Sequence, residues 1–91
     1  MRTIVRSTAF KKDFKRLQKR GIDMSQLQEI IVALASGQTL DQRHKDHSLK
    51  GAYAGFRECH ITPDWLLIYT LTFDELGLAR TGSHVDLFEK L

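Results

Sequence analysis

The pattern of apolar and polar positions divides the chain into short strands and helices. Residues 1–7 alternate moderately between apolar and polar side chains, which is typical of a short strand. Residues 9–19 follow, and their apolar side chains recur with the spacing of one helical face. These apolar residues are Phe10, Phe14 and Leu17. The pattern therefore predicts an amphipathic helix that Ser7 or Thr8 caps at its start and Gly21 ends.

A second amphipathic helix is expected between Asp23 and Gly37. Asp23 can act as the N-cap, and Gln26 three residues later completes a motif similar to a capping box. Apolar residues then form one stripe, made of Met24, Leu27, Ile30, Ile31, Leu34 and Ala35. Because about three residues separate the two helices, we expect them to pack as an antiparallel hairpin.

The second half of the chain predicts a long loop and three strands. Residues 38–52 are polar, and loops of that length in compact domains are often functional. Strands are expected at about 53–61, 65–72 and 76–82. The middle strand is apolar on both faces, so it should be the central one. A short terminal helix is expected over residues 84–90.

This order of elements predicts an α+β fold that spans residues 1–91 as a single domain. The expected order is β-α-α-β-β-β with a short C-terminal helix. The helical hairpin should pack on one face of a twisted, mostly antiparallel sheet. The other face should stay partly open because no further helix is available to cover it, and a site is expected there, beside the long loop.

Composition narrows the class of protein. The hydrophobic fraction of 42% is ordinary for a globular chain, so wholesale disorder is not expected. No apolar run approaches the roughly 20 residues that cross a bilayer, and no apolar segment follows the N-terminal charges as it would in a signal peptide. A single cysteine, Cys59, cannot form an internal disulfide. We therefore expect a cytoplasmic protein that does not bind membranes.

Positive charge is concentrated near the N-terminus. The formal net charge is +3, yet residues 1–20 carry eight of the 14 lysine and arginine residues and one of the 11 acidic residues. Such a local field can attract a polyanion such as nucleic acid, although the same pattern is common on a solvated helix face. The candidate basic face consists of Lys11, Lys12, Lys15, Arg16 and Lys19.

Candidate chemistry gathers around the turn between the first two strands of the second half. His60, Asp64 and Trp65 lie around this turn. His47 lies in the long loop, and His84 lies at a junction between a strand and a helix. Imidazoles beside a carboxylate can take up a proton and deliver it near neutral pH. The pattern therefore favours general acid–base chemistry.

Other interpretations remain open at this stage. His44 and His47 with Cys59 and His60 could supply metal ligands, but their spacing matches no recognised structural zinc motif. Cys59 should alternate to the face opposite the neighbouring histidine and pack in the core, and no serine lies in a nucleophile-elbow context. Trp65 and Phe88 could equally be core residues, and a loop histidine is commonly a solvated surface residue.

Acid–base chemistry of this kind is sufficient for RNA cleavage. A base removes the proton from a ribose 2′-hydroxyl, which attacks the adjacent phosphorus, and an acid protonates the departing 5′-oxygen. Arg57 or Arg80 could stabilise charge on the phosphoryl oxygens. Trp65 and Phe88 could stack on unpaired bases. No metal is needed, because the substrate supplies its own nucleophile.

Four motifs occur in one order along nearly the whole chain. They are KDHSLKG at residues 45–51, GFRECH at 55–60, PDWLLIY at 63–69 and RTGSH at 80–84, with Phe88 beyond. Together they resemble the RelE/ParE superfamily of small bacterial toxins, and specifically its YafQ-type branch of ribosome-dependent mRNA endonucleases. The resemblance implies a RelE-like fold whose sheet cradles mRNA in the ribosomal A site.

The resemblance also implies a set of catalytic and nucleotide-positioning residues. The matching residues are His47, His60, Asp64, Trp65, His84 and Phe88. We expect His84 to be the general acid and His47 or His60 to be the base. Asp64 would orient an imidazole or share the role of the base, and the two aromatic residues would position the nucleotide.

The implied partners are a cognate antitoxin, mRNA and the ribosome, with operator DNA bound only indirectly through the antitoxin complex. The basic helix would then hold ribosomal RNA rather than the cleaved strand. Two alternatives belong to other functional classes: a non-catalytic toxin that poisons DNA gyrase, and a plain RNA-binding module. The histidine and aspartate set weighs against the gyrase poison, because a pure binder has no need of three imidazoles.

Overall fold

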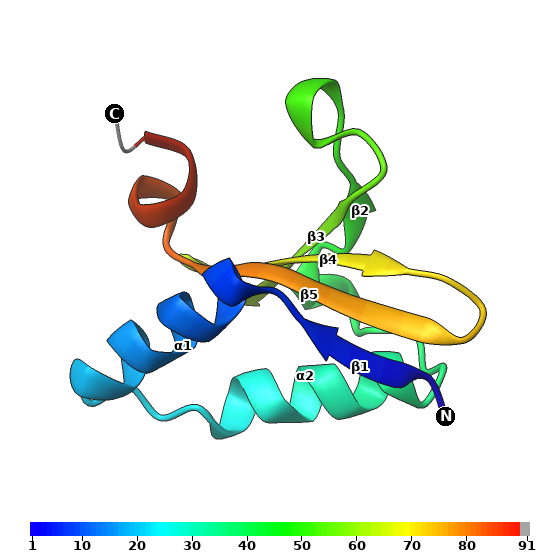
Figure 1. Ribbon diagram of the computed structural model, residues 1–91, viewed down its shortest axis with the longest axis horizontal. Coiled ribbons are helices and arrows are strands. Elements are labelled where there is room, and N and C mark those ends of the chain that lie inside the picture. Colours follow the sequence, from blue (N-terminus) through cyan, green and yellow to red (C-terminus); the bar gives the residue numbers. More distant parts are fainter. Residues whose placement is uncertain (90–91) are drawn as a thin grey trace.

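The computed structural model describes residues 1–89 and contains a five-stranded sheet with the order β1-β5-β4-β3-β2 (Figure 1). The strands are β1 (Thr3–Arg6), β2 (His47–Ser48), β3 (Arg57–Thr62), β4 (Trp65–Leu71) and β5 (Glu75–Gly82). β1 pairs with β5 in parallel, and the other neighbouring strands are antiparallel. The predicted α+β class, the mostly antiparallel sheet and the central position of β4 are confirmed.

Two helices, α1 (Thr8–Lys19) and α2 (Ser25–Ala35), lie along one face of this sheet (Figure 1). Helix α1 packs against β5, and α2 packs against β3 and β5. The two helices contact the sheet more than each other, so the expected hairpin is splayed rather than closely paired. Within residues 1–89, no helix is both long and apolar enough to cross a bilayer.

The starts of the two helices agree only in part with the sequence pattern. Ser7 caps α1 as predicted, because its Oγ accepts a hydrogen bond from the Phe10 backbone N–H at 2.9 Å. The N-cap position of α2 is Met24 rather than Asp23. Asp23 accepts a hydrogen bond from the Ser25 backbone N–H at 2.9 Å, so the predicted capping box does not form.

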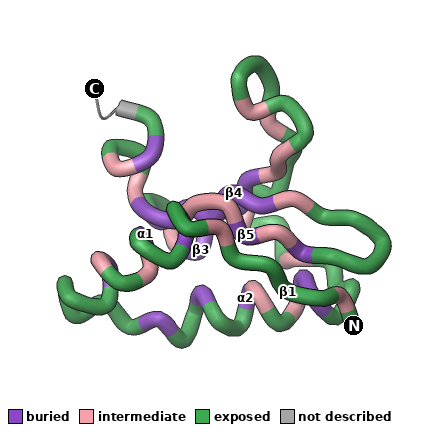
Figure 2. The backbone as a smooth tube through the Cα atoms, in the orientation of Figure 1, coloured by how far each residue is buried: buried purple, intermediate pink, exposed green. Residues whose placement is uncertain are grey.

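Apolar side chains fill both faces of the centre of the sheet. In β4, Leu67 and Tyr69 point toward the helices, whereas Leu66 and Ile68 point to the opposite face, where Leu87 covers them. Figure 2 shows the buried residues concentrated in β3, β4 and β5 and recurring at intervals along α1 and α2. Alternation along a central strand explains the continuous apolar run that marked β4 in the sequence.

The segment predicted as a long loop contains regular structure. It holds the short turns η1 (Gln42–His44) and η2 (Gly51–Tyr53), with β2 between them. β2 pairs with β3, which begins at residue 57 rather than at 53 as expected. A two-residue strand is too short to show alternation, so the sequence pattern could not reveal it. This pairing fixes the position of His47.

The last element among the described residues is a single helical turn, η3 (Val85–Glu89). Lys90, which the predicted final helix included, lies outside the described residues. Figure 1 shows η3 and the segment with η2 on the side of the sheet opposite α1 and α2. We call this side the open face, and the other side the helix face.

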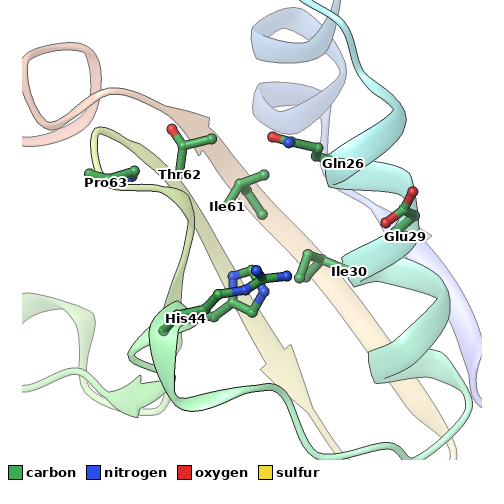
Figure 3. Close-up of a pocket in the computed structure, with 8 residues that line it drawn as sticks. Gln26, Glu29, Ile30, His44, Ile61, Thr62 and Pro63 are labelled. Carbon is green, nitrogen blue, oxygen red and sulfur yellow. The ribbon is translucent and has the colours of Figure 1, made fainter.

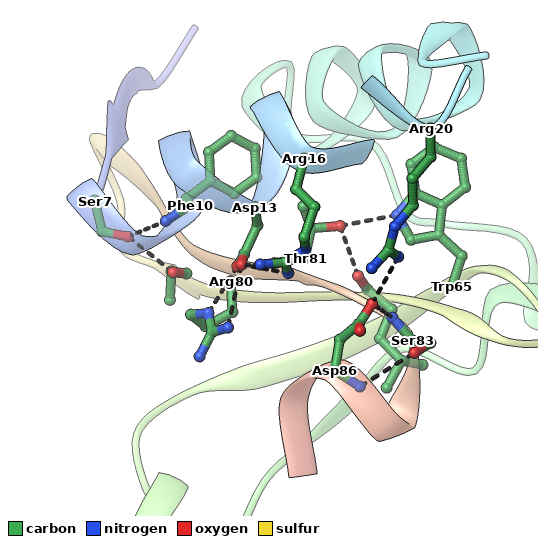
Figure 4. A network of polar contacts seen from close by, with 12 residues as sticks. Ser7, Phe10, Asp13, Arg16, Arg20, Trp65, Arg80, Thr81, Ser83 and Asp86 are labelled. Atoms are coloured by element: carbon green, nitrogen blue, oxygen red, sulfur yellow. Dashed lines mark hydrogen bonds and ion pairs between the residues drawn. The ribbon is translucent and has the colours of Figure 1, made fainter. Parts of the chain in front are cut away.

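A buried carboxylate joins α1 to β5 (Figure 4). Asp13 is 2% exposed and accepts hydrogen bonds from Arg80 Nε at 2.6 Å and from the Thr81 backbone N–H at 3.1 Å. Arg16 adds a third donor at 2.9 Å. Because a buried charge is tolerated only when it is paired and hydrogen-bonded, this network explains an aspartate in the core-facing surface of a basic helix.

Candidate active site

Two histidines flank a buried carboxylate on the open face. Strand pairing places His47 opposite Glu58 and His60 opposite Leu66. His47 Nε2 lies 3.5 Å from Glu58 Oε1, and His60 Nε2 lies 3.7 Å from the same oxygen. Glu58 is 5% exposed. We refer to these three residues, His47, Glu58 and His60, as the buried half of the site after its buried carboxylate; the side chains of His60 and His47 are 16% and 50% exposed.

Glu58 was not among the residues that the sequence analysis selected. It lies two positions before His60 in β3, so both side chains point to the same face of the strand. This period of two is the signal that could have identified it. The pairing with β2, which places His47 beside it, was not visible in the sequence.

Backbone carbonyl groups orient both imidazoles of the buried half. His47 Nδ1 lies 2.6 Å from the Lys45 carbonyl oxygen, and His60 Nδ1 lies 3.3 Å from the Pro63 carbonyl oxygen. A carbonyl oxygen only accepts hydrogen bonds, so each Nδ1 carries the proton and donates it. Each Nε2 is therefore left facing the carboxylate of Glu58.

A second histidine–carboxylate pair, the exposed half of the site, consists of Asp64 and His84. His84 Nδ1 lies 3.8 Å from Asp64 Oδ1, and the two side chains are 46% and 82% exposed. Asp64 belongs to the turn between β3 and β4, and His84 lies between β5 and η3, two residues after the end of β5. Asp64 thus pairs with His84, although the sequence alone left open which imidazole it would orient.

Local hydrogen bonds hold the backbone on either side of His84 (Figure 4). The Ser83 backbone N–H donates to Asp86 Oδ2 at 3.2 Å, and the Asp86 backbone N–H donates to Ser83 Oγ at 3.1 Å. This reciprocal pair resembles a capping box. Gly82, at φ +154°, leaves room for it, because a Cβ there would lie 3.1 Å from Asp86 Cβ.

The two halves meet on the open face. The His60 and His84 ring centroids are 6.0 Å apart, and the Phe88 ring lies 6.1 Å from the His84 ring. Phe88 is 39% exposed and packs against Tyr53, with ring centroids 5.5 Å apart. The structure therefore brings His47, His60, Asp64, His84 and Phe88 to one surface, as the sequence analysis expected.

Trp65 does not belong to this surface. It is 9% exposed, packs in the helix-face core, and donates a hydrogen bond from Nε1 to Thr81 Oγ1 at 2.9 Å. Its position in β4 turns the ring away from the open face. The interpretation of Trp65 as a stacking surface is corrected: the ring is part of the core beneath the site.

The two candidate arginines have different surroundings. Arg57 pairs with Tyr69 across the strands, which places it on the helix face, where it donates to Ser48 Oγ at 2.9 Å and Asp46 Oδ1 at 3.3 Å. The structure therefore separates Arg57 from the imidazoles. Arg80 pairs with Ile68 of the open face, and its hydrogen bonds with Asp13 raise its pKa. Only Arg80 stays a candidate for substrate contact.

Cys59 cannot act as a nucleophile in this fold. Its side chain is fully buried in the helix-face core, and burial raises the pKa of the thiol to about 12. The core position predicted for Cys59 is confirmed. Among residues 1–89, no three His, Cys, Asp or Glu side chains are grouped in a way that could hold a metal ion.

The basic face lies on the outer surface of α1, away from the imidazoles. Lys11, Lys12, Lys15 and Lys19 are exposed. A shallow depression runs beside them and is lined by the first three of these lysines, Arg6 and Phe14, among others. Arg16 is half-buried and hydrogen-bonded to Asp13, so its charge belongs to the network beneath α1 rather than to the open surface.

Comparison with known proteins shows the family. Residues 2–89 match the family described as a bacterial toxin of the type II toxin–antitoxin system, YafQ. The chain belongs to the YafQ family of type II toxins. The RelE-like fold and the toxin class expected from the four sequence motifs are thereby confirmed.

Three relatives illustrate the similarity. The mRNA interferase toxin YafQ of Escherichia coli (strain K12) is 42% identical over 88 residues, which is 96% of each chain. The toxin in a crystal structure of the E. coli DinJ–YafQ complex is 42% identical, with a TM-score of 0.89 over 97% of this chain and 99% of that one. A metal-bound toxin from Helicobacter pylori is 46% identical, also with a TM-score of 0.89, over 97% of this chain and all of that one.

Proposed function

We propose that this YafQ-family toxin is an endoribonuclease, an mRNA interferase that cleaves translated mRNA on the ribosome and so inhibits translation. One observation carries the proposal: two imidazoles, those of His60 and His84, lie 6.0 Å apart on an open face, each beside its own carboxylate. The E. coli relative bears the name mRNA interferase, which supports the same reaction.

The geometry supports a division of roles between the two halves of the site. We assign the base to the buried half, where His60 Nε2 faces Glu58 and can take the proton of a ribose 2′-hydroxyl. The 2′-oxygen then bonds to the adjacent phosphorus as the bond to the 5′-oxygen breaks. His84 protonates that leaving oxygen, so the products carry a 2′,3′-cyclic phosphate and a 5′-hydroxyl.

The remaining residues orient or bind. Glu58 can share protons with His47 and His60, and Asp64 orients His84 across 3.8 Å. Phe88, half exposed beside His84, offers its ring to a base of the substrate. Arg80 supplies positive charge near the phosphoryl group, and its ion pair with Asp13 partly neutralises that charge. The reaction needs no metal, because the substrate provides the nucleophile.

The partners follow from the same division of the surface. A cognate antitoxin would neutralise the toxin, as the DinJ–YafQ complex of E. coli suggests, and would carry the toxin to operator DNA. The exposed lysines of α1 would hold ribosomal RNA, while the open face holds the message. The site of action would be the bacterial cytoplasm, where translating ribosomes are found.

Mapping of RNA ends tests the proposed reaction. The protein is induced, and 5′ ends of a translated message are mapped by primer extension for the wild type, His60→Ala and His84→Ala. New ends that depend on both histidines support the nuclease, whereas growth arrest without new ends favours a gyrase poison. Protection of RNA without shortening favours a plain RNA-binding module. Gln28→Ala, an exposed position on α2, serves as the control.

Ribosome binding tests the role of the basic face. Charge reversal at Lys11, Lys12 and Lys15 should weaken binding to ribosomes. The slope of log affinity against log salt should fall by roughly two to three, because each phosphate that a lysine neutralises contributes about 0.7–0.9 to that slope. His84→Ala should leave binding nearly intact and abolish cleavage. Equal losses of binding in the two variants would contradict the separation of the two surfaces.

A further inference from the structure

One short segment outside the proposed catalytic set contacts both histidines of the buried half. It runs from Asp41 through η1 to Asp46, and η1 packs against β3. Its first contact comes from His44, whose Nδ1 lies 2.6 Å from the carbonyl oxygen of His60. Since that oxygen only accepts, His44 donates the hydrogen bond. The His44 ring points from η1 toward Ile30 of α2 (Figure 3).

The bond from His44 reaches β3 at an irregular point. The register between β3 and β4 shifts between His60 and Thr62, so the ladder by itself does not fix the strand there. His60 Nδ1 donates to the Pro63 carbonyl just beyond the shift, at 3.3 Å. His44 therefore holds the backbone of His60 from the helix face while the imidazole faces the open side.

The second contact comes from the residue after His44. Lys45 has φ 48°, and among the non-glycine residues at positions 1–89 it is the only one with a positive φ. Its backbone N–H donates to the Gln42 carbonyl at 3.0 Å, and its own carbonyl accepts the bond from His47 Nδ1 at 2.6 Å. The left-handed conformation thus turns this carbonyl toward the His47 imidazole.

The segment is also anchored from below. Asp46 accepts hydrogen bonds from the Tyr69 hydroxyl and, at 3.3 Å, from Arg57 Nε. Both partners lie on the helix face, so the Asp46 side chain points to the helix face whereas His47 points to the open face. Hydrogen bonds on both sides of the segment explain how a two-residue strand at the edge of the sheet can hold the His47 backbone in place.

We propose that His44 and Lys45 are positioning residues of the ribonuclease site, a role that rests on the proposed function. His44 fixes the backbone that carries His60, and the left-handed turn at Lys45 sets the tautomer and direction of His47. Together they aim both Nε2 atoms at Glu58. In this proposal both residues act through His60 and His47, so their replacement should change the rate of the chemical step rather than substrate binding.

The first experiment compares two replacements of His44. His44→Phe keeps a ring but removes the donor, whereas the side-chain amide of His44→Asn can place a donor where Nδ1 stands. We expect His44→Phe to lower kcat for ribosome-dependent cleavage about tenfold with KM unchanged, because small misplacements of catalytic groups are costly. We expect His44→Asn to restore kcat to within about twofold of the wild type.

A readout independent of activity accompanies this comparison. In ¹⁵N NMR spectra of the whole protein, the Nδ1 and Nε2 shifts of His60 should change in His44→Phe and return toward wild-type values in His44→Asn. Unchanged kcat and shifts in His44→Phe overturn the role of His44, as does an equal defect in the two variants. If the wild type does not cleave translated mRNA, the proposed function is contradicted. The ¹⁵N shifts of His60 in the two variants still test whether His44 positions His60.

The second experiment compares two replacements of Lys45 that both remove its charge. Glycine adopts a positive φ freely, whereas the branched side chain of valine disfavours it. We expect Lys45→Gly to keep cleavage within about twofold and Lys45→Val to lower kcat about tenfold, with a change in the His47 ¹⁵N shifts. Equal activity of the two variants, or equal His47 shifts, overturns the role of the turn. These two Lys45 variants still test the proposal if His44→Phe does not fold.

Discussion

The buried and exposed halves of the site are built in different ways. Strand pairing and backbone carbonyls hold His47 and His60 around Glu58, a carboxylate that is 5% exposed. Asp64 lies on a turn and His84 lies just before η3, and the Asp64 side chain is 82% exposed. The buried half has its geometry before any substrate binds. The exposed half relies on a weaker, solvent-screened pair, so we expect bound RNA to complete its alignment.

Among the substitutions that compare the two halves of the site, loss of the proposed general acid should reduce the cleavage rate most. His84→Ala removes the only imidazole of the exposed half, and we expect the cleavage rate to fall about 10²- to 10⁴-fold, the range for general acid catalysis. Single-turnover cleavage on programmed ribosomes, measured against pH, should also lose the limb that reports the acid. A profile that kept both limbs would rule out His84 as the acid.

A change in the buried carboxylate should have the next largest effect. Glu58→Gln keeps the volume and the buried position but removes the charge that both imidazoles face, so we expect kcat to fall roughly 10- to 100-fold. The same single-turnover assay measures it, and circular dichroism confirms the fold. Wild-type kcat in this variant would show that the imidazoles act without the carboxylate.

The exposed carboxylate should matter less. Asp64→Asn removes a charge that water already screens, and exposed pairs contribute little, so we expect kcat to fall only about two- to fivefold. The ratio between the effects of Glu58→Gln and Asp64→Asn measures the difference between the halves. If Asp64→Asn proved the more damaging change, Asp64 would have to act on the substrate directly, as a base.

The smallest effect on catalysis is expected from the core beneath both halves. Trp65→Phe removes the hydrogen bond to Thr81 and part of the packed ring. We expect the free energy of unfolding to fall by about 1–2 kcal/mol, measured by urea denaturation, with cleavage kept within about twofold. A large loss of kcat with unchanged stability would indicate that Trp65 contributes directly to catalysis rather than only to the core.

Sequence patterns predicted those parts of the fold that depend on local periodicity. The stripe of α1, the Ser7 cap and the apolar run of β4 each appear in consecutive residues, and all are confirmed. A feature that the sequence did not reveal depends on a contact between separate strands, because the pairing of His47 with Glu58 joins β2 to β3. The capping box at Asp23 was a local prediction and was wrong, since Met24 is the N-cap of α2.

The sequence by itself determined the family, the order of most elements and the presence of histidines and a carboxylate suited to proton transfer. It did so because motifs and the alternation of apolar and polar side chains are properties of residues close together in the sequence. Only the tertiary structure decided which carboxylate serves which imidazole, since Glu58, Asp64 and their partners meet through the register of separate strands. The same register turned Trp65 and Arg57 to the helix face, because a side chain's face depends on where its strand begins and which strand it pairs with.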